Sequence, residues 1–421
     1  MKLNSTIAAI VLGLGTASVA SATNYIYITG STAARAAVYN SLVAGVGFDT
    51  NATAPYFNPP SVVVTYSSST PANCSYMEFV GNVNGVSTII KAHWSGSEAG
   101  IADVSGSTSP NFLNDPGVGG VIPNGNSSTT PSGTQLVTPP AGSVNVAMAD
   151  NSITYSQTPG SNANQQGPAV VVPFTFVKAK STGIDTSAFT NITSDQFRAL
   201  ALGAKDLAMF IGQNPTQALT GVNVYLTGRD NQSGTRANTF GLTGFGINSA
   251  PNQIELVAHQ SGTPAANDGT STMFNFGTAA TPVVYYPSTS GQGSGGTLAQ
   301  SMGDTGNAPD YLEPDGSGGF YAGFVAVTYL GLADEATAVG SPYNATLLTY
   351  NGVPYSIANV ENGTYADWGN EYVLSRNGSS TAVGFVQSSL ALYLQYHTSG
   401  AEIPLNAMKV TRSGPTTPPS Y

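Results

Sequence analysis

A strand that leads through a glycine turn into a helix constrains the fold of this chain more than any other feature. Residues 24–30, NYIYITG, alternate polar and bulky side chains as a strand does. Residues 31–42, STAARAAVYNSL, are Ala-rich and typical of a helix with Ser31 or Thr32 as its N-cap. The same order recurs, with further strands predicted at 144–151, 169–179 and 222–230. Alternating strands and helices predict an α/β fold.

Another helix is predicted at 192–212, between the last two of these strands. Its apolar residues recur at helical spacing, and Thr193 and Gln196 stand at the spacing of a capping box. Residues 104–142 are instead rich in Gly, Pro, Ser, Thr and Asn without a period, so we expect a long surface loop or insertion there. Residues 406–421 are predicted to form a disordered tail.

The composition limits what the protein can bind. The chain has 421 residues, 41% of them hydrophobic, which is enough for one large or two medium domains. Only 8% are charged, far below the roughly one quarter usual in soluble domains. Ser, Thr, Asn, Gln and Gly must therefore form most of the surface. The formal net charge of -10 argues against nucleic acid as a partner, and any anion must be held by a few local groups.

The N-terminal residues 1–22 have the pattern of a cleavable secretory signal. Lys2 is the only charge, residues 7–14 are apolar, and Ala20 and Ala22 fit a small-residue cleavage site. We therefore expect a periplasmic or secreted protein. No later segment is apolar over some 18 residues, so no membrane insertion is expected. Cys74 is the single cysteine, which excludes an intramolecular disulfide, and it lies too far along the chain to be a lipid-anchored cysteine just after the signal. We expect it to be a small buried residue or a tolerated exposed one.

Three glycine-containing turns have the composition of an anion site. In α/β sheets, ligands bind where strands give way to helices, because the first N–H groups of a helix have no partner inside it. The turns are TGSTAAR at 29–35, SGSEAG at 95–100 and RDNQSGTRANTF at 229–240. In the third, Arg229 would supply charge, and Ser233, Gly234 and Thr235 would supply directional hydrogen bonds. The alternative is a plain helix cap beside a structural arginine.

These segments resemble, in the same order, the phosphate-binding proteins of ABC transporters and their relatives with the type II periplasmic binding fold. YITGSTAARAAVYN is similar to the first strand, turn and helix of that family, and VNVAMADNSIT to the segment that ends in its phosphate-contacting aspartate. VVVPFTFVKAKSTG resembles the first crossover, GRDNQSGTRANTF the arginine and SGT motif, and GGFYAGFVAVTYLGLADEA the returning crossover. The resemblance implies two α/β lobes joined by two crossover segments at a hinge.

The resemblance also implies boundaries and a site. The first lobe would comprise residues 23–173 and 319–405, and the second lobe residues 174–318. The ligand would be phosphate or a related oxyanion, captured between the lobes by hinge closure, and a membrane ABC permease would recognise the closed form. The implied ligand-binding residues are Gly30, Ser31, Thr32, Ser97, Asp150, Arg229, Ser233, Gly234 and Thr235.

The second turn departs from the family pattern. HWSGSEAGIADVSG is followed by the insertion at 104–142, so Ser95 competes with Ser97 for the role of anion contact. Glu98 beside that turn would raise the local negative potential. Arg236 follows the SGT motif and is left outside the predicted site as a solvated or salt-bridged side chain.

Asp150 has two interpretations. A buried carboxylate there would accept a hydrogen bond from a protonated phosphate and repel sulfate, which has no proton to offer. The alternative is that Asp150 only caps a turn in ADNS.

Motifs of catalysis are missing from the sequence. It has no Gly-x-Ser-x-Gly elbow, and His93, His259 and His397 have no metal-ligand spacing. We therefore predict no enzyme, no metal and no cofactor. The competing hypothesis is a secreted surface or matrix protein that keeps the fold without binding a small anion. Scarce charge, polar insertions and the altered second turn favour it, and the state of the cleft would distinguish the two.

Overall fold

The computed structural model describes residues 23–50, 57–158, 162–212, 222–258, 271–273, 285–305, 312–314, 320–412 and 419–420. The predicted signal segment and His259 lie outside these residues. The helices are α1 (Arg35–Val43), α2 (Ser97–Ser105), α3 (Ser194–Ala201), α4 (Ala208–Ile211), α5 (Gly234–Thr243), α6 (Gly295–Gln300), α7 (Leu332–Val339), α8 (Ile357–Glu361) and α9 (Thr381–Leu394).

The strands alternate with these helices along most of the chain, which confirms the predicted α/β class. They are β1 (Asn24–Gly30), β2 (Val62–Tyr66), β3 (Tyr76–Val83), β4 (Val86–His93), β5 (Phe112–Leu113), β6 (Gly125–Ser127), β7 (Leu136–Val137), β8 (Val144–Ala149), β9 (Ala163–Lys178), β10 (Asn191–Ile192), β11 (Lys205–Asp206), β12 (Asn223–Leu226), β13 (Leu256–Ala258), β14 (Ser271–Met273), β15 (Leu312–Pro314), β16 (Phe320–Ala322), β17 (Val325–Gly331), β18 (Thr346–Tyr350), β19 (Trp368–Arg376) and β20 (Ile403–Pro404).

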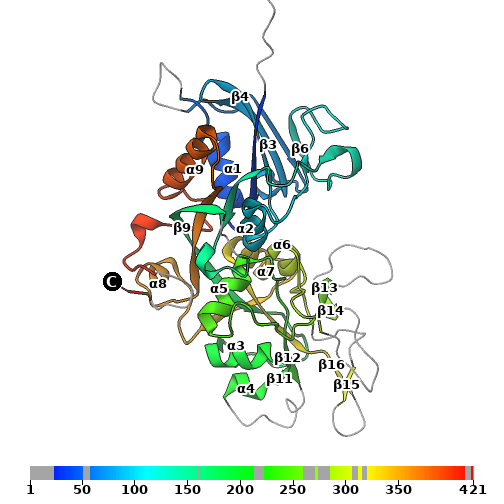
Figure 1. The fold of residues 1–421 in the computed structure, drawn as a ribbon. Coiled ribbons are helices and arrows are strands. Elements are labelled where there is room, and N and C mark those ends of the chain that lie inside the picture. Colours follow the sequence, from blue (N-terminus) through cyan, green and yellow to red (C-terminus); the bar gives the residue numbers. More distant parts are fainter. Residues whose placement is uncertain are drawn as a thin grey trace, which may run out of the picture.

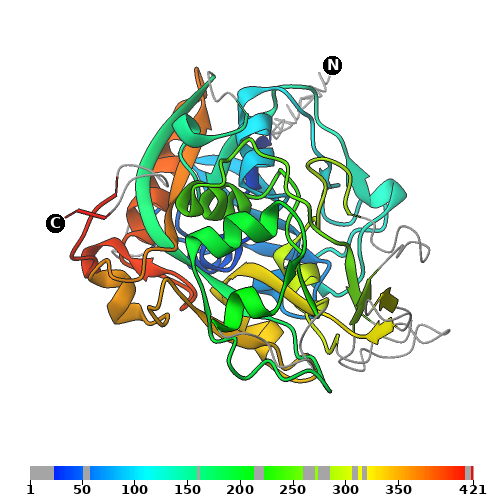
Figure 2. The ribbon, with the colours of Figure 1, turned by 90° about the horizontal axis from the view of Figure 1, so that it is seen from below.

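One long strand, β9, connects two lobes. The main sheet has the order β11-β12-β17-β9-β19-β8-β1-β4-β3-β2-β6. Residues 163–173 of β9 pair with β19, and residues 174–178 pair with β17. Figure 2 shows β9 and β19 running side by side. Most strands have 3–10 residues, whereas β9 has 16. It is therefore long enough to pair with strands of both lobes.

The first lobe, at the top of Figure 1, is a three-layer structure. α1 and α9 cover one face of its sheet, where Val38 and Leu42 of α1 and Leu390 of α9 join one buried cluster with β1, β3 and β4. α2 covers the other face through Ile101 and Val104. Apolar residues on both faces of a mostly parallel sheet centre are the pattern of a doubly covered α/β layer.

The second lobe, below it in Figure 1, is also covered on both faces. α3 and α5 pack on one side through Phe197 and Phe240, which surround Tyr329 of β17. α6 and α7 pack on the other side, with Leu298 and Ala338 in the same buried cluster as β17 residues. Each lobe thus has its own core. Residues that face the other lobe are therefore available to form a ligand site between the lobes.

Several local predictions are corrected by tertiary structure. The helix expected over 192–212 is divided into α3 and α4, because Gly203 has a φ of 137° and β11 then pairs with β12. The capping box of Thr193 and Gln196 is confirmed. The N-cap of α1 is Ala34, one turn later than Ser31 or Thr32.

The chain returns to the first lobe later than the sequence implied. β17 and β18 pair with the second-lobe end of β9, so the return falls between β18 and β19 and not near residue 319. Residues 406–412, expected in the tail, pack against the second lobe: Val410 is buried and Arg412 donates to the carbonyl oxygens of Trp368 and Ala366.

The insertion at 104–142 is a folded part of the first lobe. Leu113 and Val121 pack on Val64 and Tyr66 of β2, and β6 adds a parallel strand beside β2. The free Cys74 is buried, the first of the two expected alternatives. In the part of the chain that the structure describes, no helix is both long and apolar enough to cross a bilayer.

The insertion is fastened to the sheet by the buried Lys91 of β4. Its Nζ donates to Leu113 O at 2.7 Å and to Asp115 Oδ1 at 2.8 Å, and lies 3.7 Å from Glu78 Oε1. Burial raises the pKa of Glu78 to about 8, although Lys91 opposes the rise. The ammonium group therefore holds the insertion to the sheet through Leu113 and Asp115, while both carboxyl oxygens of Glu78 are buried without a hydrogen-bond partner.

We predict that Lys91→Met lowers the free energy of unfolding by about 3 kcal/mol, because it leaves a carboxylate and a buried carbonyl without their partner. The matched control is Lys180→Met, which removes an ion pair to Asp304 from a lysine that is 54% exposed and should cost less than about 1 kcal/mol. Urea unfolding of the two variants checks this. Equal losses would contradict the role given to Lys91.

Candidate functional site

The N-terminus of α5 touches the first lobe through Asp150, at the end of β8. Ser97 Oγ donates to Asp150 Oδ1 at 2.5 Å, and Thr235 Oγ1 of the second lobe lies 3.5 Å from Asp150 Oδ2. Asn238 Nδ2 donates to the backbone oxygen of Asp150 at 2.6 Å. The two lobes are therefore closed on each other at this point.

Glycine is required where the lobes meet. A Cβ on Gly234 would lie 1.5 Å from Asp150 Oδ1 and 2.6 Å from the Ser97 side chain. A Cβ on Gly96 would lie 2.5 Å from Gln232 O, which accepts a hydrogen bond from Glu98 N at 3.0 Å. The SGT motif thus brings bare backbone against the carboxyl group, and Ser233 caps α5 by accepting from Arg236 N.

Burial raises the pKa of Asp150 above its ordinary value. Its side chain is 2% exposed, and burial raises its pKa to about 6, while the Ser97 hydroxyl and the charge of Arg229 oppose the rise. Glu371 of β19 is also buried, and burial, with the nearby charge of Asp150, raises its pKa well above the ordinary value. Both carboxyl groups therefore favour protonation more than exposed ones do.

In the first turn, TGSTAAR at 29–35, the contacts of Gly30 and Ser31 are with neighbouring backbone. Gly30 has a φ of 118°, and a Cβ there would lie 2.0 Å from Met148 O. Ser31 N donates to that same oxygen at 2.8 Å, and Ser31 Oγ accepts from Ala34 N. Both residues shape the turn, whereas Thr32 lines open space between the lobes.

Arg229 is buried and partly bound. Its Nε and Nη2 donate to the carbonyl oxygens of Gln292 and Gly293 at 3.1 and 3.2 Å. Its Nη1 lies 3.4 Å from the position that a Cβ on Gly295 would take, and Asp334 Oδ2 lies 1.9 Å from that same position. The guanidinium group thus faces the region of Asp334, and its Nη1 takes no part in the hydrogen bonds to Gln292 and Gly293.

Two charged residues in this region were missed by sequence reasoning. Arg35 begins α1 and Asp334 lies in the first turn of α7. Together with Thr32 and Thr235 they line a small enclosed space of about 30 Å³ between the lobes. Arg35 stands in the quoted TGSTAAR turn, so its arginine was a signal that the prediction did not use; nothing local marked Asp334.

The three charges Arg35, Arg229 and Asp334 influence one another without forming an ion pair with any described residue. Burial raises the pKa of Asp334, with both arginines opposing the rise. Burial lowers the pKa of Arg35 from its ordinary value, and Arg35 Nε is buried without a hydrogen-bond partner. Two arginines with unused donors beside one carboxyl group form a site that can bind an anion.

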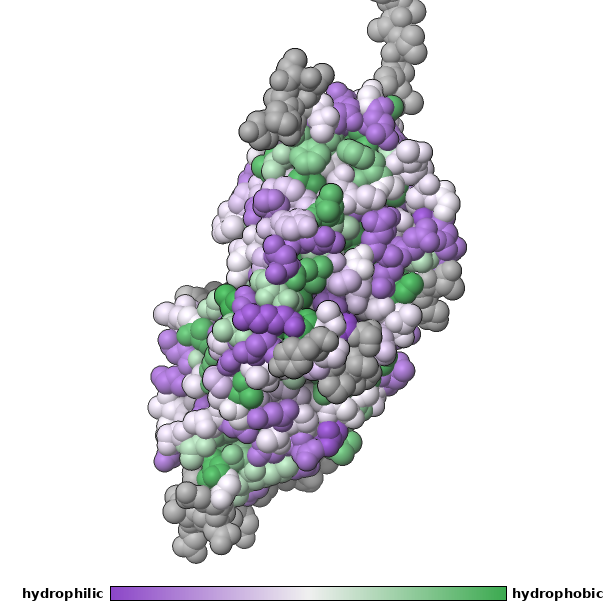
Figure 3. All heavy atoms as spheres, turned by 90° about the vertical axis from the view of Figure 1, so that its left-hand side faces the viewer, coloured by the Kyte–Doolittle hydropathy of each residue, from purple (hydrophilic) through white to green (hydrophobic). Residues whose placement is uncertain are grey.

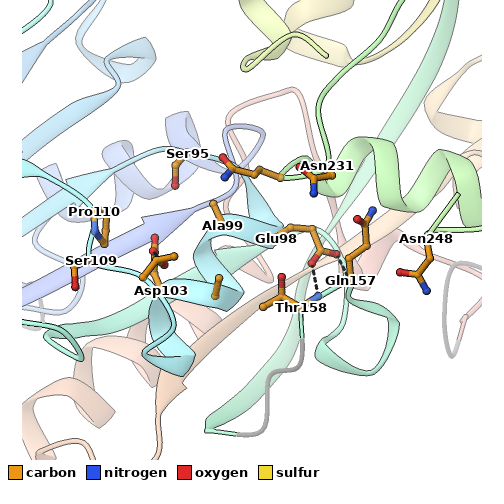
Figure 4. A pocket seen from close by; sticks show the side chains of 13 residues that line it. Ser95, Glu98, Ala99, Asp103, Ser109, Pro110, Gln157, Thr158, Asn231 and Asn248 are labelled. Atoms are coloured by element: carbon orange, nitrogen blue, oxygen red, sulfur yellow. Dashed lines mark hydrogen bonds between the residues drawn. The ribbon is translucent and has the colours of Figure 1, made fainter. Parts of the chain in front are cut away.

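The remaining predicted groups have other roles. Glu98 accepts from Asn151 Nδ2, Ser156 Oγ and the backbone N–H groups of Gln157 and Thr158, so it is turned away from α5 (Figure 4). Ser95 lines a separate cavity of about 610 Å³, between Asp103 and Ser109 on one side and Asn231 on the other. Ser97, not Ser95, is therefore the serine that meets Asp150.

Arg236 is buried and not solvated, which corrects the expectation for it. Its guanidinium donates to the carbonyl oxygens of Arg229, Thr289 and Ser249, and stacks 4.9 Å from the ring centroid of Phe240. Arg236 thus holds the Arg229 backbone in place. Among the described residues, no group of three or more His, Cys, Asp or Glu side chains is arranged to hold a metal ion.

No family model matches the chain, and no curated protein matches it. Solved structures do align with it. A protein of Clostridium perfringens with bound phosphate, assigned as a phosphate ABC transporter substrate-binding protein, covers 87% of this chain and 93% of its own at 11% identity and a TM-score of 0.43.

PstS from Borrelia burgdorferi covers 86% of this chain and 91% of its own at 11% identity and a TM-score of 0.34. An ABC-type phosphate transport receptor from Vibrio cholerae covers 87% and 93% at 13% identity and a TM-score of 0.41. At identities of 11–13%, these structures resemble this chain in fold alone.

We predict that Gly234→Ala opens the lobes. The added methyl group overlaps Asp150 and Ser97, and such overpacking costs about 1–3 kcal/mol, which falls on the closed form. Small-angle scattering should show a larger radius of gyration than for the wild type. The control is Gly384→Ala in α9, where a Cβ meets nothing within 4 Å. Unchanged scattering for Gly234→Ala would mean that this contact does not hold the lobes together.

The raised pKa of Asp150 predicts a pH dependence. Because the folded pKa is about 6, above the ordinary value of about 3.9, ionisation is costlier in the folded state. The stability of the wild type relative to Asp150→Asn should therefore fall by about 2 kcal/mol as the pH rises from about 4 to about 7. Urea unfolding at both pH values measures it, with Asp195→Asn, 84% exposed, as the control. A constant difference would contradict burial of the carboxyl group.

Proposed function

We propose that this protein is an extracytoplasmic solute-binding protein that holds phosphate or a related oxyanion between its lobes. The observation that carries the proposal is the approach of Arg35 and Arg229, from opposite lobes, to Asp334, with neither arginine in an ion pair with a described residue. Of the two arginines, Arg35 lines the small space together with Asp334. Thr32 lines the same region and has a hydroxyl donor for an oxyanion, and Thr235, whose hydroxyl group lies 3.5 Å from Asp150 Oδ2, lines the small space as well.

Asp334 supplies selectivity in this proposal. A carboxylate beside two arginines accepts a hydrogen bond from a protonated phosphate oxygen, and it repels an oxyanion that has no proton. Asp150, which the sequence suggested for this role, lies behind Thr235 and does not line the space beside Arg35. Its carboxyl group contacts Thr235, Ser97 and the α5 backbone. Asp150 would therefore position Thr235.

Closure follows from where the ligand sits. Arg35 and Thr32 belong to the first lobe, whereas Arg229, Thr235 and Asp334 belong to the second. A ligand that contacts both binds the closed form better and shifts the population towards it. A membrane permease that recognises the closed form would then bind the protein with its ligand. We propose that the hinge serves this purpose.

One observation favours a second function, a secreted surface or matrix protein that binds no small anion. The lobes already touch through Ser97, Asp150 and Gly234, and the small space of about 30 Å³ has room for roughly two water molecules. The polar surface fits this role as well: the face in Figure 3 mixes hydrophilic and pale residues with scattered hydrophobic ones.

Calorimetry with inorganic phosphate separates the two functions. We expect a dissociation constant in the micromolar range (about -8 kcal/mol) and weaker binding of sulfate. Arg35→Met and Arg229→Met should each weaken phosphate binding roughly ten- to hundredfold, because each removes charge-assisted hydrogen bonds. Arg198→Met, which breaks an exposed ion pair, is the matched control and should bind as the wild type does. No heat from folded wild-type protein with either anion would favour the surface-protein function.

A further inference from the structure

The space beside the arginines opens into a larger cavity. Thr32, Arg35 and Asp334 line both the enclosed 30 Å³ space and an adjoining cavity of about 530 Å³ between the lobes. Cavities of about 300–1,000 Å³ suit organic ligands of metabolite size. An inorganic oxyanion at the arginines would leave nearly all of this cavity to water.

The wall of the large cavity is neutral and polar. The first lobe contributes Asn73 and Ser75, and the second contributes Thr297, Gln300 and Thr337. Arg35 and Asp334, at the end shared with the small space, are the only Lys, Arg, Asp or Glu residues among the described residues that line it. Hydroxyl and amide groups both donate and accept hydrogen bonds, so they match a body that has many hydroxyl groups.

An aromatic surface completes the wall. Tyr76 and His93 are stacked with ring centroids 4.4 Å apart, and Trp94 lines the cavity next to them. Burial lowers the pKa of His93 to about 4, so its ring is neutral at pH 7. Two buried polar atoms of lining residues, His93 Nδ1 and Ser67 Oγ, have no hydrogen-bond partner in the protein.

We propose that the ligand is an organic phosphate whose phosphate group lies at Arg35 and Arg229 and whose hydroxylated body, a sugar or polyol, fills the 530 Å³ cavity. This inference rests on the proposed function, since the same arginines hold the anionic group. The apolar face of a sugar ring packs on aromatic side chains, and its hydroxyl groups meet Asn73, Ser75 and Gln300. Charge is confined to one end of the cavity, as a monophosphate requires.

Calorimetry with glucose 6-phosphate, glycerol 3-phosphate and myo-inositol 1-phosphate, beside inorganic phosphate and glucose, tests the inference. At least one organic phosphate should bind about tenfold or more tighter than inorganic phosphate, and glucose should bind far more weakly than either. Gln300→Ala changes an exposed residue at the end of α6, and Tyr76→Leu keeps an apolar side chain on β3. Both should weaken binding of the organic phosphate about fivefold and leave inorganic phosphate unchanged.

The outcomes separate the two proposals. Inorganic phosphate binding as tightly as every organic phosphate would overturn this inference and leave the proposed function standing. Failure of all phosphates to bind would remove the proposed function as well. An Arg35→Met variant that loses both kinds of phosphate, together with a Gln300→Ala variant that loses affinity only for the organic one, is the result expected if both hold.

Discussion

The contact between the Asp150 carboxyl group and the N-terminus of α5 is the interaction on which the arrangement of the lobes depends. It joins the end of β8 to the SGT turn across the cleft, with Ser97 and Thr235 beside the carboxyl oxygens. It is possible only because Gly234 has no side chain. The N-terminus of a helix favours negative charge, so the contact is attractive even though burial raises the pKa of Asp150. Closure here brings Thr32 and Arg35 towards Arg229 and Asp334.

The scarcity of charge makes the placement of each arginine informative. Arg236 and Arg412 are buried, and both are bound to backbone carbonyl oxygens and stacked on an aromatic ring, which is a structural role. Arg35 differs because its guanidinium has no hydrogen bond or ion pair to any described residue, and Arg229 because it shares a region with Asp334 without pairing to it. In a chain with 8% charged residues, two incompletely bound arginines at one cleft favour an anionic ligand.

Local patterns allowed the elements to be predicted, and distant contacts prevented prediction of the whole site. β1, the cap of α5 at Ser233 and the capping box of α3 depend on neighbouring residues, so the sequence displays them. The division of 192–212 into two helices depends on the pairing of β11 with β12, which no local pattern shows. Arg35 and Asp334 line one space because β9 runs through both lobes and β17, which leads into α7, pairs with its second-lobe end. Their separation in the chain hid Asp334 from sequence reasoning.

The glycine-rich turns show the same limit. Gly30 and Ser31 have the residue types of an anion loop, yet the turn is occupied by its own contact with Met148 O, and Thr32 alone of the three faces the open space. Ser97 and Asp150 satisfy each other. The composition of a turn therefore indicated where the lobes meet, while the ligand-facing atoms were determined by which hydrogen bonds the fold had already used.

A crystal structure of the protein grown with arsenate tests the central claim most directly, because arsenate has the shape and protonation of phosphate and its arsenic atom is located by anomalous scattering. We expect one peak between the lobes, with oxygens within hydrogen-bond distance of the Arg35 and Arg229 guanidinium groups and the Thr32 and Thr235 hydroxyl groups. An arsenate at the Ser95 cavity, or no ordered arsenate between closed lobes, would contradict it.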